Sequence, residues 1–324
     1  MATVMVTGVG AIIGYGALRS LRATGRQLKL IGADIYADAV GQAWSDAFEQ
    51  APLTSSSQYL GWLREVIAKH AVDLIIPGIE QDVHFFSAHR TALATLGARF
   101  VLNDEDLVEA SKDKWLMHEA LADVAPEIRI PTALSGEFDS LAREFGLPFL
   151  LKPRRSYASK GIVRVGDAQT FSQHAGGLGR DLMAQKLVGD DDAEYTVSAF
   201  GDGTGTVRAS ISLRRRLAQD GSSAKVWVSR FDDLDAIVAK LFAKFRPTGP
   251  TNLQFRKTED GWKLLEINPR ISSATSLRTA FGYNESAMCL THFLDGGVIT
   301  QPTIRQGFAA RFIEDYVVYD RDHF

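Results

Sequence analysis

The sequence predicts an α/β leading domain with a parallel, doubly wound sheet, followed by a larger α+β portion. Two observations support this fold class. Strand and helix signals alternate through the first hundred residues, which is the pattern of βαβ units. The alternation of strands and helices ends after Asn103. From Met183 onward the sequence predicts mostly strands, which is typical of an antiparallel sheet.

The leading elements are apolar runs that end at glycine, proline or aspartate. A β-branched run marks the first strand, and Leu18 and Leu21 share one face of the helix after it. Leu60, Leu63 and Ile67 form a similar stripe further along. The predicted elements are a strand over 3–7, a helix ending at Gly25, a strand over 28–32, a helix over 59–70, a strand over 72–76 and, after another helix, a strand over 100–102.

The second portion begins with a helix and continues into strands. Asn103 or Asp104 is a suitable N-cap for a helix that carries Lys112 and Lys114 and that Pro126 ends. The remaining predicted elements are a helix over 139–145 and strands over 149–151, 195–200, 206–213, 226–228, 252–255 and 263–267.

Composition excludes several classes of protein. A length of 324 residues corresponds to about two domains, and 45% hydrophobic residues suffice for a sizeable core. A net charge of −3 excludes a generally basic nucleic-acid binder. The single cysteine, Cys289, cannot form an internal disulfide, and we see neither a signal peptide nor a membrane-spanning run. We therefore expect a soluble, cytoplasmic protein that contacts neither nucleic acid nor membrane.

A glycine turn follows the first strand. Gly8, Gly10 and Gly14 lie between that strand and a helix, and Asp34 stands where a ribose-binding acid would lie in a dinucleotide site. The spacing is looser than the dinucleotide fingerprint. A nucleotide-binding turn and a tight strand-to-helix turn are both open interpretations.

The strongest chemical signal is the segment KLLEINPR at 263–270. Because side chains alternate along a strand, we expect Leu264, Glu266 and Asn268 on one face. A carboxylate and an amide oxygen at the end of a core strand form half of a Mg²⁺ site, which water and phosphates complete. Arg270 follows at once and offers a fork of donors to a phosphate or carboxylate.

The register of the preceding strand decides whether Gln254 joins this site. A two-residue loop made of Asp260 and Gly261 would pair Gln254 with Ile267 and turn it to the wrong face. A three-residue loop with Gly261 in the left-handed conformation pairs Gln254 with Glu266, and this register is the one we predict.

Two further segments have the chemistry of a nucleotide site. Lys152 ends an apolar strand, where a charge is costly without a partner, and a small-residue loop with flanking cations follows it at 154–162. A solvated basic loop is the alternative for those cations. The segment 183–189 reads as an extended hinge that can offer backbone groups to an adenine edge, with Glu194 placed for a ribose.

The order of these motifs resembles the ATP-grasp superfamily, in particular the synthase domains of carbamoyl phosphate synthetase. The resemblance implies a Rossmann-like pre-ATP-grasp domain over 1–105, an ATP-grasp small lobe over 106–184 and a large lobe with the Mg-ATP and substrate site over 185–324. It implies Gln254, Glu266 and Asn268 as metal ligands. It also implies that Lys114 and Lys152 contact phosphates.

The resemblance assigns the other nucleotide contacts as well. Ser156, Ser159 and Gly161 belong to the loop over the triphosphate, and Gln185, Lys186 and Val188 to the adenine hinge. Glu194 is assigned to the ribose. Arg270, Lys152 and Arg216 are the expected catalytic residues, Arg216 because alternation places it with Arg214 on one strand face. A solvated edge strand is the alternative for Arg214 and Arg216.

The implied activity is ligation with ATP and Mg²⁺, or Mn²⁺ in its place. A small-molecule carboxylate would attack the γ-phosphoryl group, and an amine or other nucleophile would capture the acyl phosphate. Glu80 is a candidate for receiving a substrate amine, with helix capping as the alternative. A homodimer is possible. Competing hypotheses are an ATP-binding phosphotransferase, a non-catalytic nucleotide-binding regulatory protein and an NAD(P)-dependent oxidoreductase.

Overall fold

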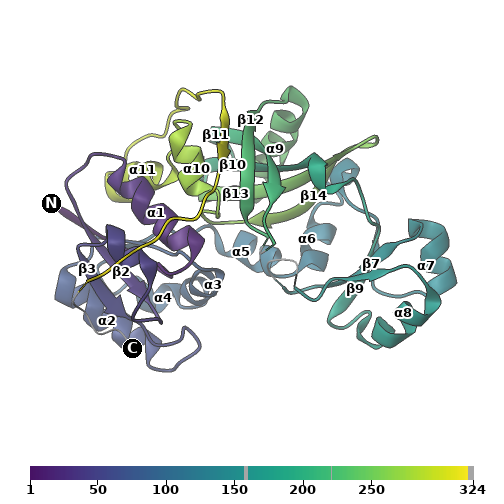
Figure 1. Ribbon diagram of the computed structural model, residues 1–324, viewed down its shortest axis with the longest axis horizontal. Helices are drawn as coiled ribbons and strands as arrows, with labels where there is room; N and C mark the ends of the chain where they lie inside the picture. The colour runs from purple at the N-terminus through teal and green to yellow at the C-terminus, as the bar shows by residue number, and fades with distance from the viewer. Residues whose placement is uncertain (157–159, 220, 320–324) are drawn as a thin grey trace.

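Three sheets follow one another across the molecule in the computed structural model, which describes residues 1–156, 160–219 and 221–319 (Figure 1). The parallel leading sheet lies at one end, a large antiparallel sheet in the middle and a small antiparallel sheet at the other end. This mixed α/β arrangement agrees with the predicted fold class.

The leading sheet has five parallel strands in the order β3-β2-β1-β4-β5. Its strands are buried on both faces, since Val4 and Val6 pack on one side and Met5 on the other. The short strand β3, half of which is polar, was not predicted. The elements are β1 (Ala2–Thr7), α1 (Ile12–Arg22), β2 (Leu28–Asp34), the 3₁₀ turn η1 (Val40–Trp44), β3 (Ala47–Gln50), α2 (Tyr59–His70), β4 (Leu74–Ile76), α3 (Glu80–Ala88), α4 (Arg90–Leu93) and β5 (Arg99–Phe100).

The small sheet forms a separate lobe with the order β6-β9-β7-β8. Its core contains Phe149, Leu151 and Phe171, so the apolar run before Lys152 is a buried strand as predicted. The elements are β6 (Thr132–Ala133), α7 (Phe138–Phe145), β7 (Phe149–Pro153), β8 (Val163–Val165), α8 (Ala168–His174), the 3₁₀ turn η3 (Ala175–Gly177) and β9 (Leu182–Gln185).

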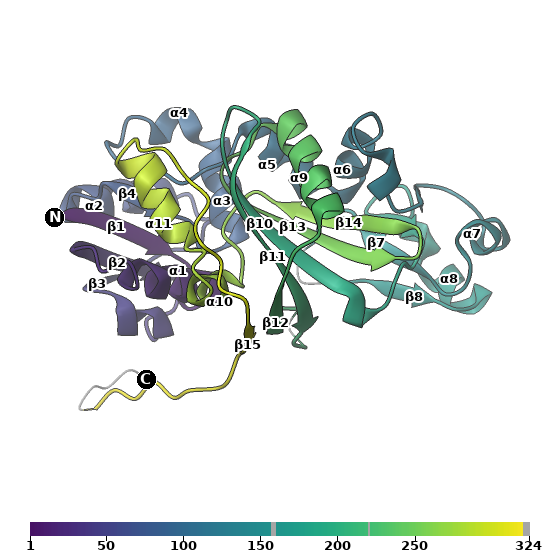
Figure 2. The same cartoon turned by 90° about the horizontal axis from the view of Figure 1, so that it is seen from above.

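The large sheet has the order β14-β13-β10-β11-β12-β15. One face packs against α9, which the sequence analysis missed, and against α5 and α6 (Figure 2). The elements are α5 (Glu105–Lys112), α6 (Lys114–Ala120), the 3₁₀ turns η2 (Pro126–Ile128) and η4 (Asp191–Ala193), β10 (Glu194–Asp202), β11 (Val207–Leu217), β12 (Ser223–Ser229), α9 (Asp232–Phe245), β13 (Thr248–Thr258), β14 (Gly261–Asn268), α10 (Thr275–Ala280), α11 (Glu285–Cys289), the π-turn η5 (Leu290–Leu294) and β15 (Phe308–Ala310).

The leading domain shares a core with the large sheet. Leu18 and Leu21 of α1 belong to the same buried cluster as Ile211 of β11 and Tyr283. This common core holds the loops after β1 and β4 against the large lobe, which places them at the edge of the candidate site. No helix in the described part of the chain is long and apolar enough to cross a membrane.

Candidate active site

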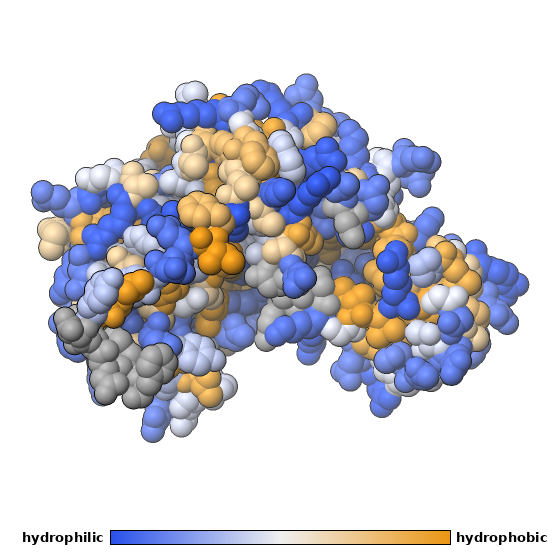
Figure 3. Space-filling view, viewed as in Figure 1, coloured by the Kyte–Doolittle hydropathy of each residue, from blue (hydrophilic) through white to orange (hydrophobic). Residues whose placement is uncertain are grey.

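A cleft of about 530 Å³ lies where the three sheets meet. Its walls come from the loops after β1 and β4, from the small lobe, and from β10, β11, β13 and β14. Figure 3 shows the surface hollowed between the small lobe, at the right, and the rest of the molecule. The predicted site residues that line the cleft are Lys114, Lys152, Ser156, Gln185, Lys186, Val188, Glu194, Gln254, Glu266 and Arg270.

The other predicted residues have different positions. Asn268 contacts both Glu266 and Arg270 through its side chain. Gly161 is exposed beside Ile162, which lines the cleft. Ser159 lies outside the described residues.

Gln254 lies opposite Glu266 on neighbouring strands, so the predicted register is confirmed. The loop that produces this register differs from the predicted one. Thr258 pairs with Gly261, which leaves a two-residue loop, and Gly261 has the expected left-handed conformation with φ of +95°. The extra residue is instead Leu265, which forms a bulge between the paired residues Leu264 and Glu266.

The bulge changes which side chains share a face. Leu264 and Ile267 both pack in the core between the large sheet and its helices, whereas Leu265 and Glu266 line the cleft. The prediction that Leu264 lies on the face of Glu266 is therefore wrong. Strict alternation applies only to a strand without an inserted residue.

Glu266, Asn268 and Arg270 form a chain of hydrogen bonds. Asn268 Nδ2 donates to Glu266 Oε1 at 3.0 Å, and Arg270 Nη2 donates to Asn268 Oδ1 at 3.1 Å. Burial alone would raise the pKa of the Glu266 carboxyl. The hydrogen bond from Asn268 and the neighbouring cations Lys152, Lys114 and Arg215 outweigh it, so this pKa lies below its ordinary value. Glu266 therefore presents a carboxylate to the cleft.

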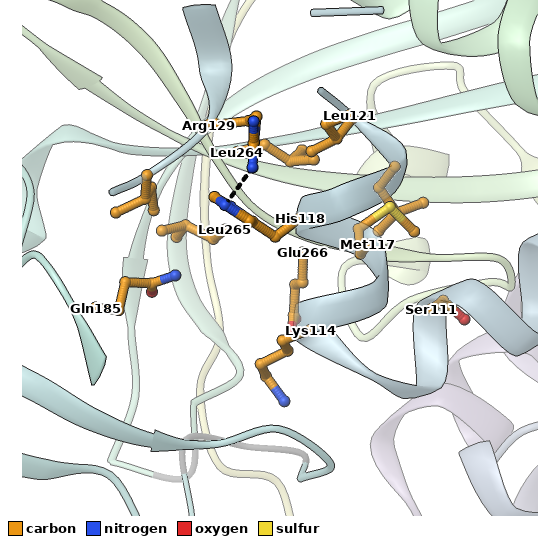
Figure 4. A pocket seen from close by; sticks show the side chains of 12 residues that line it. Ser111, Lys114, Met117, His118, Leu121, Arg129, Gln185, Leu264, Leu265 and Glu266 are labelled. Atoms are coloured by element: carbon orange, nitrogen blue, oxygen red, sulfur yellow. Dashed lines mark hydrogen bonds between the residues drawn. The ribbon is translucent and has the colours of Figure 1, made fainter. Parts of the chain in front are cut away.

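Two lysines face this carboxylate. Burial lowers the pKa of the Lys152 ammonium to about 8, although Glu266 acts in the opposite direction. The pKa of Lys114 is also lowered, chiefly by burial. Lys114 Nζ donates to the C=O of Ser156 at 2.7 Å, and Figure 4 shows it on α6 beside Glu266. Half-buried ammonium groups without a full counter-charge suit an anionic ligand.

A break between two helices turns Lys114 toward the cleft. The sequence predicted one helix carrying Lys112 and Lys114, but α5 and α6 are separated at Asp113. Asp113 is buried and caps α6, because its carboxylate accepts the N–H of Trp115 at 2.9 Å. It also pairs with Arg154 at 2.7 Å. Arg154 is thus bound to α6, although the sequence analysis counted it among the cations available to phosphate.

The hinge segment is partly engaged within the fold. Gln185 Nε2 donates to Thr132 Oγ1 at 3.0 Å, and the N–H of Lys186 donates to the C=O of Pro131 at 2.9 Å. The N–H of Lys186 is therefore already engaged within the fold. An adenine edge would have to contact other backbone groups of this segment.

Glu194 is held by two arginines that the sequence analysis missed. Its carboxylate accepts from Arg215 Nε at 3.1 Å and from Arg256 Nη2 at 3.3 Å. Arg215 also donates to Gln254 Oε1, and Arg256 donates to the C=O of Val188 at 3.2 Å. Both arginines line the cleft, so they connect the predicted ribose and metal positions.

The prediction that Arg216 projects into the cleft is wrong. Arg215 is buried there, whereas Arg214 and Arg216 lie on the opposite, exposed face of β11. Arg214 donates to the C=O of Asp192 at 2.8 Å, and Arg216 pairs with its carboxylate at 2.9 Å. The predicted alternation is correct but the predicted face is wrong, because Leu213, which shares the face of Arg215, packs in the core that the large sheet has in common with the leading domain.

The glycines of the turn after β1 allow backbone segments to pack closely against one another. A Cβ on Gly14 would lie 2.2 Å from the carbonyl oxygen of Gly8, and one on Gly78 would lie 2.1 Å from that of Thr7. The N–H of Gly10 donates to Asp34 at 2.7 Å. The N–H of Gly10 is therefore already engaged by an internal carboxylate, and these contacts favour the tight-turn interpretation over the nucleotide-binding one.

Glu80 faces the site rather than capping its own helix. It lies in the first turn of α3, lines the cleft and accepts from Arg270 at 3.1 Å. The two side chains bring a carboxylate and a guanidinium together at the wall supplied by the leading domain.

A buried polar network supports the strands that carry the site. Arg278 and Glu285 are fully buried and paired at 3.1 Å, and Arg278 also donates to Asn252 Oδ1 at 2.6 Å. Thr196 donates to the same oxygen at 2.6 Å. Asn252 lies opposite Asn268 in the sheet. Two opposite charges within an otherwise uncharged stretch, residues 271–294 apart from His292, are the sequence signal that could have revealed this network.

Replacing Glu285 by Gln should destabilise the chain by about 3 kcal/mol, because it leaves the buried Arg278 without its counter-charge. Urea unfolding measures the change. The matched control is D295N, which removes an exposed ion pair with Arg26 and should cost less than about 1 kcal/mol. Equal effects of the two substitutions would contradict the importance of the buried pair.

Comparison with known proteins identifies the fold. Residues 180–316 match a family model described as an ATP-grasp in the biosynthetic pathway with Ter operon. The carbamoyl phosphate synthase large chain of Methanosarcina mazei is 22% identical over 291 residues, which cover 83% of this chain and 27% of that protein. A D-alanine–D-alanine ligase of Cupriavidus pinatubonensis is 25% identical over 197 residues, which cover 58% of this chain and 56% of the ligase.

A solved structure extends the likeness to nearly the whole chain. The N5-carboxyaminoimidazole synthetase of Staphylococcus aureus complexed with ADP has a TM-score of 0.72 at 15% identity, over 94% of this chain and 80% of that one. The chain therefore has an ATP-grasp fold. The predicted resemblance to the ATP-grasp superfamily and to carbamoyl phosphate synthetase is confirmed, although the chain spans only about a quarter of the length of those synthases.

Proposed function

We propose that this chain is an ATP- and Mg²⁺-dependent ligase that activates a small-molecule carboxylate as an acyl phosphate for capture by an amine or other nucleophile. The observation that carries the proposal is one cleft in which Lys114 and Lys152 face the carboxylate of Glu266. The names of the relatives support the same reaction type, since they include a D-alanine–D-alanine ligase and a carbamoyl phosphate synthase.

The metal ligands would be Gln254, Glu266 and Asn268. One carboxylate and two amide oxygens suit Mg²⁺, which prefers oxygen ligands and completes its shell with water and nucleotide phosphates. No three His, Cys, Asp or Glu gather as metal ligands in the part of the chain that the structure describes, so this mixed set is the candidate. Bound Mg²⁺ would neutralise phosphate charge, and Mn²⁺ takes the same oxygen ligands.

The remaining residues would bind and orient the reactants. Lys114 and Lys152 would hold the phosphates, and Ser156, Ser159 and Gly161 would contribute further contacts to them. Gln185, Lys186 and Val188 would lie along the adenine, and Glu194 near the ribose.

Arg270 would orient the substrate carboxylate for the reaction. One oxygen of this carboxylate attacks the γ-phosphorus, and the bond from that phosphorus to the leaving ADP oxygen breaks. The amine then displaces phosphate from the acyl phosphate. Catalysis is positioning and charge stabilisation, and no enzyme nucleophile is needed.

The test is ADP release by the full chain with MgATP and a panel of carboxylates, with and without amines. We expect ADP release that requires both a carboxylate and an amine. Release that needs a carboxylate alone would favour a phosphotransferase. Failure to bind MgATP would overturn the proposal. Sedimentation of the same sample tests the homodimer that the sequence analysis allowed for.

The pH dependence of kcat/KM for ATP should report the protonation of Lys152. Its ammonium has a pKa of about 8, so kcat/KM for ATP should fall as the pH rises above that value. Fold stability should change in the opposite direction. An unfolded lysine keeps its proton to about pH 10, so the unfolded state binds more protons across this window and stability rises with pH.

The matched variant is Lys152→Arg, whose guanidinium stays charged throughout. Its kcat/KM for ATP should remain flat across the same range. A wild-type profile that is equally flat would contradict the assignment of Lys152 to the phosphates.

A further inference from the structure

A second pocket, of about 280 Å³, lies at the carboxyl edge of the leading sheet. We call it the leading-domain pocket. It is formed by the ends of β1, β2 and β3 and by the start of α3, and it shares Ala11 and Ile79 with the ATP cleft. Ligands in open α/β sheets bind in the crevice beyond the carboxyl ends of the strands. The two cavities therefore adjoin at these two residues.

Two buried carboxylates define the chemistry of this pocket. Asp82 is 2% exposed, and its Oδ1 accepts from Thr54 at 2.7 Å and from Tyr59 at 2.8 Å. Asp34 is 7% exposed and accepts from the backbone N–H groups of Gly10 at 2.7 Å and of Tyr36 at 3.1 Å. Among the described residues that line the pocket, the charged ones are these two acids.

The electrostatics of the pocket favour a cation. Burial raises the pKa of the Asp82 carboxyl, and the nearby charge of Asp34 raises it further. Hydroxyl and amide donors satisfy hydrogen bonds but supply no positive charge. A bound ammonium group would neutralise the pair, whereas a phosphate or carboxylate would be repelled. The rest of the lining is largely apolar, including Ala51, Pro52 and Ile79, which suits an aliphatic chain.

We propose that the leading-domain pocket binds a second, non-reacting ammonium group at the end of an aliphatic substrate. This inference rests on the proposed function, because the reacting end of the same substrate lies in the ATP cleft beyond Ala11 and Ile79. The amine substrate would then be an aliphatic molecule with an amino group at each end. The cavity is smaller than the 300–1,000 Å³ typical of complete drug-sized ligands, as expected for a subsite that holds one end of a molecule.

The test is calorimetric titration of 1,4-diaminobutane into the full chain without ATP. We expect binding to wild type and binding at least about tenfold weaker to D82N, whose amide oxygen still accepts from Thr54 and Tyr59. D82N should fold, since burial already disfavours the charge that it removes. A second variant, Y36K, places a competing ammonium at an exposed position of the pocket lining and should also weaken binding.

The matched control is E65Q, which removes an exposed carboxylate on α2 outside both cavities. It should bind 1,4-diaminobutane like wild type. Undiminished binding to D82N, equal weakening by E65Q and D82N, or absence of binding to wild type would overturn the inference. MgATP binding by the same proteins separates the two proposals: its loss in wild type overturns the ligase, whereas D82N should bind MgATP normally.

Discussion

Replacing Glu266 by Gln is expected to lower the rate of ADP release at saturating MgATP by about 10³-fold. Glu266 is the single carboxylate in the proposed metal set, and its neighbours keep its pKa below the ordinary value. Glutamine has the same shape and can still accept from Asn268, which now donates at 3.0 Å. The chain should therefore fold, and the loss should appear in kcat rather than in the amount of folded protein.

The matched control is E259Q in the loop of the same hairpin, where Glu259 is exposed. It should release ADP at the wild-type rate. Circular dichroism and thermal unfolding of both variants establish that they fold. An E266Q variant with more than about a tenth of wild-type activity would contradict the metal assignment.

Replacing Lys152 by Met is expected to weaken MgATP binding by about 10²-fold and to reduce turnover further. Methionine fills the space of the aliphatic stem and removes the charge that would meet the triphosphate. Burial penalises this ammonium and lowers its pKa to about 8, so its removal should leave stability unchanged or raise it. Loss of binding together with retained stability distinguishes a ligand-binding lysine from a structural one.

K240M on α9 is the matched control, because Lys240 forms an exposed ion pair with Glu127 at 3.0 Å, outside the cleft. Titration with a fluorescent ATP analogue measures both variants. Equal affinities of K152M and wild type would exclude Lys152 from the phosphate site. Reduced affinity in K240M would show that the assay reports general electrostatics instead.

Much of the candidate site follows from local sequence chemistry. The KLLEINPR segment ends a strand in the cleft, and its glutamate, asparagine and arginine contact one another. Lys152 could be recognised because a charge at the end of an apolar run needs a partner. These inferences use only the strand period and the cost of burying charge, and both are local properties.

Other features depend on contacts between distant segments. The face of β11 is set by the core that Leu213 shares with the leading domain, so Arg215 rather than Arg216 lies in the cleft. Asp113 and Arg154 are 41 residues apart in the chain, yet their ion pair anchors the loop after β7 to α6. No single stretch of sequence contains this information.

The sequence by itself specified the parallel leading sheet, the strand that ends in Lys152 and the pairing of Gln254 with Glu266. The first two follow from the hydrophobic periodicity of short segments, whereas the pairing was predicted from a three-residue loop that the structure does not contain. The tertiary structure settled how the pairing is reached, through a bulge at Leu265 rather than a longer loop, and it showed that the glycines of the turn after β1 allow close backbone packing. The reason is physical: a bulge or a close backbone contact is selected by what packs against it, and that partner lies far away along the chain.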